Sequence, residues 1–136
     1  MATITYTVTV ATGTNQYGTG DKFYINGSVS PALNLIEGNT YIFDTSDSTV
    51  SGDLFSFSTS ANNSPSAPYT TGVTQNGTAG TSGANTTIVV ATNAPTLYYY
   101  CTNHAGMGNV AYTLAAGSIA TTANFEASFT IDEVIE

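Results

Sequence analysis

The sequence predicts an all-β protein, and three observations lead to that prediction. Apolar and polar residues alternate with a period of two from residue 3 to residue 10, where isoleucine, tyrosine and valine take turns with threonine. Glycine and asparagine separate such stretches, as they do in tight turns. No window of helical length carries an apolar stripe with helical spacing. Short strands at close spacing favour an antiparallel sandwich or barrel.

The strands are expected in a simple order along the chain. After the first strand, strand-like stretches follow at residues 22–25, 33–36, 40–44, 54–58, 86–91, 97–101, 109–114 and 124–131. Their threonines and tyrosines suit half-buried pleated surfaces. Polar low-complexity segments at residues 59–68 and 77–85 are typical of exposed loops.

The length and the spacing of these elements predict one domain over residues 1–136. We expect its core at residues 21–114, and we expect residues 1–14 and 115–136 to be strand extensions outside that core. The acidic last turn, residues 132–136, is expected to fray.

The charge of the chain excludes several classes of function. The formal net charge is −8, and Lys22 is the only basic residue among lysines and arginines. One cation cannot neutralise a run of phosphates or hold an anionic membrane surface, so we expect no nucleic-acid partner and no membrane partner. No apolar run approaches the ~20 residues that span a bilayer. A hydrophobic content of 41% nevertheless suffices for a packed core.

Most of the reactive side chains lie in one heptapeptide between two predicted strands. Cys101, His104 and Met107 offer a thiolate, an imidazole and a thioether, which are ligands that copper prefers. Gly106 and Gly108 flank Met107 and would let the loop fold tightly. Because the chain has a single cysteine, it forms no internal disulfide.

This loop resembles a known family. Residues 98–109, YYYCTNHAGMGN, are similar to the C-terminal copper loop of the cupredoxins, the plastocyanin and azurin class. The chain is more closely similar to cupredoxin-like modules of marine bacteriophage virion proteins, over about residues 21–112. The blocks that carry this resemblance are FYING at 23–27, LNL at 33–35, EGNTY at 37–41, FDTSDS at 43–48, YTTGV at 69–73 and PTLYYYCTNHAGMGN at 95–109. It implies a Greek-key antiparallel β-sandwich of about 7–9 strands with extra terminal strands.

The chain departs from the copper-binding pattern at one position. The resemblance implies a second histidine upstream, in a Ser-Gly-His-Pro-Leu type of sequence, but residues 51–55 read SGDLF and place Asp53 there. His104 is the only histidine, so one subunit cannot form a His2Cys centre, and a carboxylate is a poor ligand for Cu(I). Three readings stay open: Cys101, His104 and Met107 are ordinary structural residues, or they hold Cu(I) or Zn(II), or they form a working blue-copper site.

Two other sites are weaker hypotheses. Cys101 and His104 could form a nucleophile pair, but no third member is evident, so we expect no enzyme activity and no catalytic residues. Asp44, Asp47 and Asp53 could offer oxygens to Ca²⁺, although a solvated loop is the favoured interpretation.

The resemblance implies a phage virion structural protein, namely a capsid decoration or cement protein or a fibre-associated component. We expect it on the outer surface of the particle, made in the host cytoplasm, as a homo-oligomer bound to the major capsid protein or to another virion protein. No cofactor is expected; the alternative is a small copper-binding electron-transfer protein.

The terminal strands are the predicted interaction sites, because a strand can add to the edge of a neighbour's sheet. Deleting residues 1–12 or 120–136 should then weaken attachment more than it unfolds the core. The residues concerned are Ile4, Tyr6, Val8, Val10, Phe125, Phe129 and Ile131.

Overall fold

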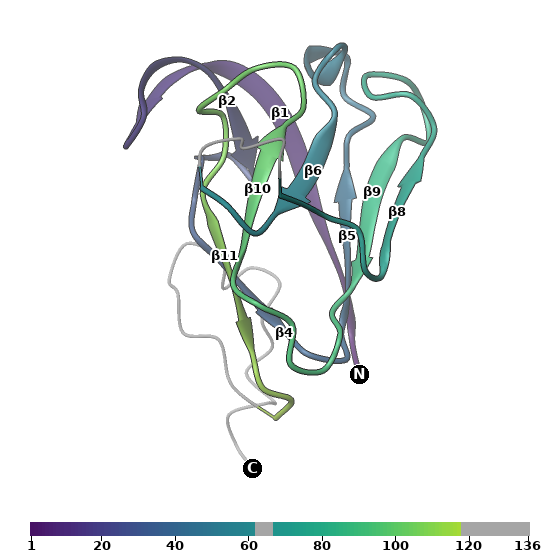
Figure 1. Ribbon diagram of the computed structural model, residues 1–136. Coiled ribbons are helices and arrows are strands. Elements are labelled where there is room, and N and C mark those ends of the chain that lie inside the picture. Colours follow the sequence, from purple (N-terminus) through teal and green to yellow (C-terminus); the bar gives the residue numbers. More distant parts are fainter. Residues whose placement is uncertain (62–66, 118–136) are drawn as a thin grey trace.

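The computed structural model describes residues 1–61 and 67–117 of the chain, and the described part is all-β (Figure 1). Its strands form two mixed sheets that are consistent with a β-sandwich. The six-stranded sheet has the order β3-β2-β1-β5-β9-β8, and the five-stranded sheet has the order β4-β11-β10-β6-β7. The strands are β1 (Thr3–Asn15), β2 (Gly18–Ile25), β3 (Ser28–Val29), β4 (Leu33–Ile36), β5 (Thr40–Asp44), β6 (Phe55–Ser58), β7 (Pro68–Tyr69), β8 (Val73–Asn76), β9 (Asn85–Val89), β10 (Leu97–Cys101) and β11 (Val110–Leu114), with a short 3₁₀ turn, η1 (Ser48–Val50), after β5.

One hydrophobic core joins the two sheets, and aromatic rings dominate it. Phe43 of the first sheet stacks on Phe55 of the second, with ring centroids 4.6 Å apart. Phe55 in turn stacks on Tyr99 at 5.2 Å. All three side chains are buried, as the inward positions of strands with a period of two should be.

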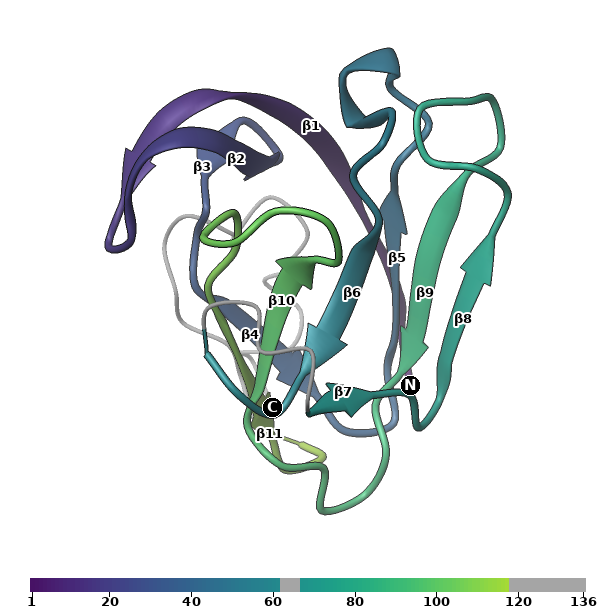
Figure 2. The same cartoon turned by 45° about the horizontal axis from the view of Figure 1, so that its top comes forward.

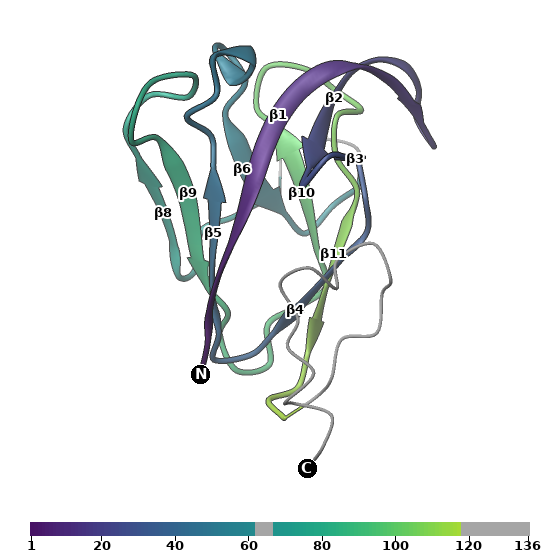
Figure 3. The same cartoon turned by 180° about the vertical axis from the view of Figure 1, so that it is seen from behind.

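β1 lies inside its sheet, which corrects the expectation that residues 1–14 form an extension outside the core. Its first half, Thr3–Thr7, pairs in parallel with β5, and its second half pairs antiparallel with β2 (Figure 3). Tyr6 and Val8 belong to the hydrophobic core, and Ile4 and Val10 pack against it. Deleting residues 1–12 would therefore remove part of the core as well as a strand.

The structure confirms the all-β class and corrects the purely antiparallel arrangement. β1 pairs in parallel with β5, and β4 pairs in parallel with β11. Parallel partners need a long connection, which is provided here by the intervening strands of the sandwich. The strands predicted at residues 33–36, 40–44 and 97–101 are confirmed at those bounds.

The described residues contain eleven strands, more than the predicted number. β3 and β7 have only two residues each, and β8 has one partly buried apolar residue, Val73, so none of them shows apolar alternation. Residues 77–84 connect β8 and β9 as a loop, whereas the prediction was 77–85; Asn85 begins β9. The strand predicted at residues 124–131 and the extension at 115–136 lie wholly or mostly outside the described residues.

The connections at one end of the sandwich position the candidate site. Figure 2 brings this end forward and shows the loop from β10 to β11 near the segment that leads into β6, with the β1–β2 hairpin on the other side. Within the described part of the chain, no helix has the length and apolarity needed to cross a bilayer.

Candidate functional site

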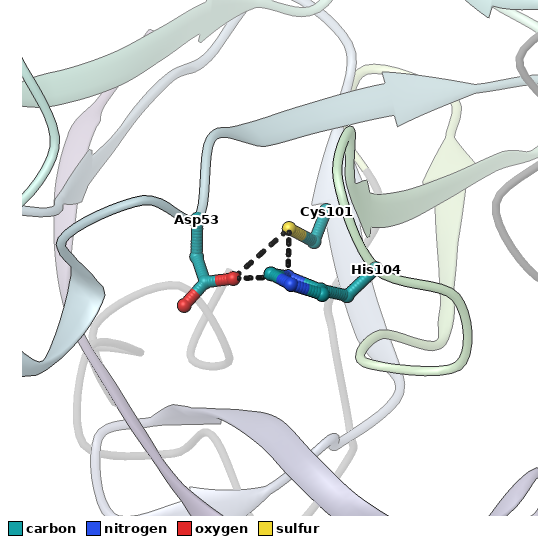
Figure 4. A group of neighbouring side chains, drawn as sticks. All are labelled: Asp53, Cys101 and His104. Atoms are coloured by element: carbon teal, nitrogen blue, oxygen red, sulfur yellow. Dashed lines mark hydrogen bonds and ion pairs between the residues drawn. The ribbon is translucent and has the colours of Figure 1, made fainter.

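The structure brings together three of the predicted site residues, Asp53, Cys101 and His104 (Figure 4). One ligand atom from each of them lies within 4.8 Å of the other two. Cys101 ends β10 and pairs with Phe55, the first residue of β6. Asp53 precedes Phe55 by two residues, and His104 follows Cys101 by three, so strand pairing alone places them near each other.

A single oxygen of Asp53 holds the other two side chains. Oδ1 accepts a hydrogen bond from the Cys101 thiol, with Sγ 3.2 Å away, and it lies 2.7 Å from Nδ1 of His104. An ionised carboxylate can only accept, so the network assigns the His104 proton to Nδ1. The thiol sulfur lies 3.7 Å from Nδ1 and accepts from the backbone N–H of Asn103 at 3.4 Å.

Burial and Asp53 both favour the neutral thiol. The pKa of Cys101 is raised to about 11, chiefly by burial and further by the hydrogen bond and negative charge of Asp53. The backbone N–H groups of Asn103 and His104 act in the opposite direction without cancelling it. The thiolate is the metal ligand and the nucleophile, so at neutral pH the reactive form of this cysteine is scarce.

Hydrogen bonds hold the β10–β11 loop on both of its sides. On one side the Asn103 side chain donates to Gly52 O at 2.6 Å. On the other side, Lys22 Nζ and Asn15 Nδ2 both donate to Gly106 O, at 2.7 Å and 2.8 Å. Lys22 and Asn15 were not identified as site residues from the sequence. The presence of a single lysine and no arginine could have drawn attention to Lys22.

Met107 has a structural place in the core. Met107 is 1% exposed and belongs to the core cluster. Its carbonyl oxygen accepts from Phe23 N at 3.0 Å and from Ser30 Oγ at 2.9 Å. These surroundings agree with one of the three interpretations given above, in which Met107 is an ordinary structural residue that packs in the core.

The donor set does not fit a blue-copper ion. Such a site needs a thiolate and two imidazoles, and Asp53 supplies a hard oxygen in place of the second imidazole. The chain has no other histidine. The potential ligands also bond to one another through their protons, so a metal held between Sγ of Cys101, Oδ1 of Asp53 and Nδ1 of His104 would have to displace the protons of the thiol and of Nδ1.

The same geometry does not form a nucleophile–base–acid relay. In such a relay the two imidazole nitrogens contact different partners. Here Nδ1 faces both Asp53 and the sulfur. His104 is the most accessible member, with 62% of its side chain exposed, whereas 10% of the Asp53 side chain is exposed.

The other acidic residues do not join Asp53 in a calcium site. Asp44 Oδ1 accepts from the backbone and hydroxyl of Ser46, and Asp47 accepts from those of Thr49 at the start of η1. These hydrogen bonds lower the pKa of the Asp47 carboxyl. Within residues 1–61 and 67–117, Asp53, Cys101 and His104 make up the one group of three ligand-type side chains.

The predicted interaction residues take different places. Tyr6 and Val8 are buried and Ile4 and Val10 are partly buried, so these side chains face their own core. Phe125, Phe129 and Ile131 lie outside the described residues.

Comparison of the sequence with protein-family models and with curated proteins finds no match.

Proposed function

We propose that the protein is a structural component of a phage virion: a capsid decoration or cement protein, or a fibre-associated one. In this proposal its sandwich is of the cupredoxin-like Greek-key type and its copper position is degenerate. The sequence blocks at about residues 21–112 support the family. The observation that supports a degenerate site is the Asp53 carboxylate, which binds both Cys101 and His104. The sequence resemblance implies a second histidine where this aspartate stands.

A site that is closed by its own hydrogen bonds supports a structural role in place of electron transfer. The thiol, the imidazole and the carboxylate each have a partner, so the loop needs no metal to stay in place. On this view the protein is not an enzyme, and its function lies on its surface.

The surface is suited to contacts other than ion pairs. The sole Lys/Arg residue, Lys22, is buried, so no lysine or arginine is presented outward. Attachment to the major capsid protein, or to another virion protein, then relies on apolar and main-chain contacts together with acidic side chains. We propose a homo-oligomer on the outer surface of the particle.

One observation favours the alternative, a small copper-binding protein. The three ligand atoms of Asp53, Cys101 and His104 do lie within 4.8 Å of one another. The donor chemistry counts against it, because one imidazole, one carboxylate and a protonated thiol suit neither oxidation state of a cycling copper ion.

Mass spectrometry of density-gradient-purified particles, from the phage whose genome encodes the chain, tests the proposal. Trypsin has a single lysine to cut at, so digestion should use a protease specific for acidic residues. We expect the protein to band with the particles at a fixed ratio to the major capsid protein. Its recovery only from the soluble lysate would contradict the proposal, and copper that co-purifies with it would favour the alternative.

A further inference from the structure

Lys22 is a buried cation without an acidic partner in the described structure. The residue is 4% exposed, and its ammonium donates to Gly106 O at 2.7 Å. Among the residues described, the one ion pair is that between His104 and Asp53. An ammonium has three N–H donors, and burying its charge without an anion is costly. Lys22 therefore has donors and a charge left to satisfy.

The same lysine lines a pocket that is open to solvent. The pocket has a volume of about 330 Å³ and is lined by residues of the β1–β2 hairpin and of the β10–β11 loop. Tyr17, Thr19 and Asp21 line it from the hairpin side, and His104 and Gly106 line it from the loop. This volume is at the small end of the roughly 300–1,000 Å³ of small-molecule sites.

We infer that this pocket binds a small carboxylate, with the Lys22 ammonium as its counter-ion. The ligand's charge follows from the pocket. Lys22 and Asp21 both line the pocket, so a monoanion adds one negative charge to a balanced pair, whereas a dianion such as phosphate adds two and is more strongly disfavoured in a protein of net charge −8. Tyr17 and His104 also line the pocket, so aromatic side chains are available to contact the organic part of the ligand. This inference does not depend on the proposed virion function.

Nuclear magnetic resonance can read this site with unusual clarity, because the chain has one lysine and one histidine. Selective ¹³C labelling of these two residue types gives one set of side-chain signals for each. In a titration with sodium acetate at constant ionic strength, we expect the Lys22 and His104 signals to shift together and to saturate. Inorganic phosphate should bind more weakly. Shifts that grow linearly without saturation, or tighter binding of phosphate, would overturn the inference.

Three variants sharpen the test. Lys22→Met keeps the aliphatic stem and removes the charge, so the acetate-dependent shift of His104 should disappear; a retained shift would overturn the role of Lys22. Asp21→Asn removes a negative charge at the pocket and should tighten acetate binding about threefold.

Glu37→Gln is the matched control, because it removes the same charge in the turn between β4 and β5, at the opposite end of the sandwich (Figure 1). It should leave acetate binding unchanged. If Lys22→Met fails to fold, the comparison of Asp21→Asn with Glu37→Gln decides alone: equal affinities in the two variants would count against the pocket.

Discussion

At the scale of single residues, the Oδ1 atom of Asp53 determines the chemistry of the candidate site. It accepts from both Cys101 and His104, and it adds to the burial that keeps the thiol protonated. A neutral imidazole at the same position could accept a hydrogen bond or coordinate a metal ion, but it would not bring the negative charge of a carboxylate. The difference between a hydrogen-bonded cluster and a soft metal site therefore rests on one side chain.

Substitution of this residue gives the first prediction. In the Asp53→His variant, Cys101 and two imidazoles are available, so stoichiometric Cu(II) should produce the intense visible band of thiolate-to-copper charge transfer. The unsubstituted protein should show no such band in the same titration. Asp53→Asn is the control, because it removes the charge without adding an imidazole, and it should also stay colourless. A band from the unsubstituted protein would instead support the copper-binding alternative.

The sequence predicted part of this site. The SGDLF segment placed Asp53 at the expected second-ligand position, and the heptapeptide gave Cys101 and His104. The contacts of Lys22 and Asn15 with Gly106 O join residues 84 and 91 positions apart. Neither the hydrophobic periodicity nor a sequence motif indicates which distant polar side chain will contact a given carbonyl. These contacts could therefore be identified only from the three-dimensional structure.

At the scale of elements, the β10–β11 loop folds tightly because of its glycines. Gly106 adopts φ +80°, in the left-handed region that favours glycine. Gly108 lies against the strand before it, so that a Cβ at this position would overlap the Tyr99 carbonyl oxygen and come within 3.0 Å of the Tyr99 ring. The loop can return toward β11 only if that side chain is absent.

Gly108→Ala should therefore destabilise the protein by about 2 kcal/mol or more, because a backbone carbonyl or the whole loop must move. Urea unfolding measures the loss. Gly20→Ala is the matched control: its Cβ meets nothing within 4 Å. It should change the free energy of unfolding by less than about 0.5 kcal/mol. Equal losses in the two variants would contradict the close approach of Gly108 to Tyr99.

The strands were predictable from the sequence where their residues show apolar alternation or a continuous apolar run. The strands at residues 33–36, 40–44 and 97–101 alternate or run apolar, and their bounds were correct. The place of β1 was not predictable, because alternation shows that a strand buries one face but does not name its neighbours. Only the tertiary pairing reveals that β1 joins β2 to β5 and so completes the six-stranded sheet.

At the scale of the whole molecule, the stability of the fold rests on aromatic and aliphatic burial, since 7% of the residues are charged. Several of the buried groups are weak acids that the fold keeps neutral. Burial raises the pKa values of Tyr41 and Tyr99 above 10.0, and burial with Asp53 raises that of Cys101 from 9.0 to about 11. Raising the pH should therefore destabilise the folded protein, because it favours ionisation of groups buried in the core.

The direction of the pH effect follows from proton linkage. Between pH 9.0 and about 11 the unfolded chain loses the Cys101 proton while the folded protein keeps it. The folded state then binds more protons, so the free energy of unfolding falls as pH rises. The buried tyrosines extend this fall above pH 10.0, where their unfolded forms begin to ionise.

Urea unfolding midpoints measured below and above pH 9.0 test this expectation. They should decline in the unsubstituted protein as the pH rises through 9.0 toward 10.0. Cys101→Ser keeps a hydrogen-bond donor for Asp53 but does not titrate in this range, so its decline over the same interval should be shallower. The comparison of slopes is independent of any constant cost of the substitution. Identical slopes would mean that Cys101 has the same pKa in the folded and the unfolded protein, which would contradict the raised pKa of the buried thiol.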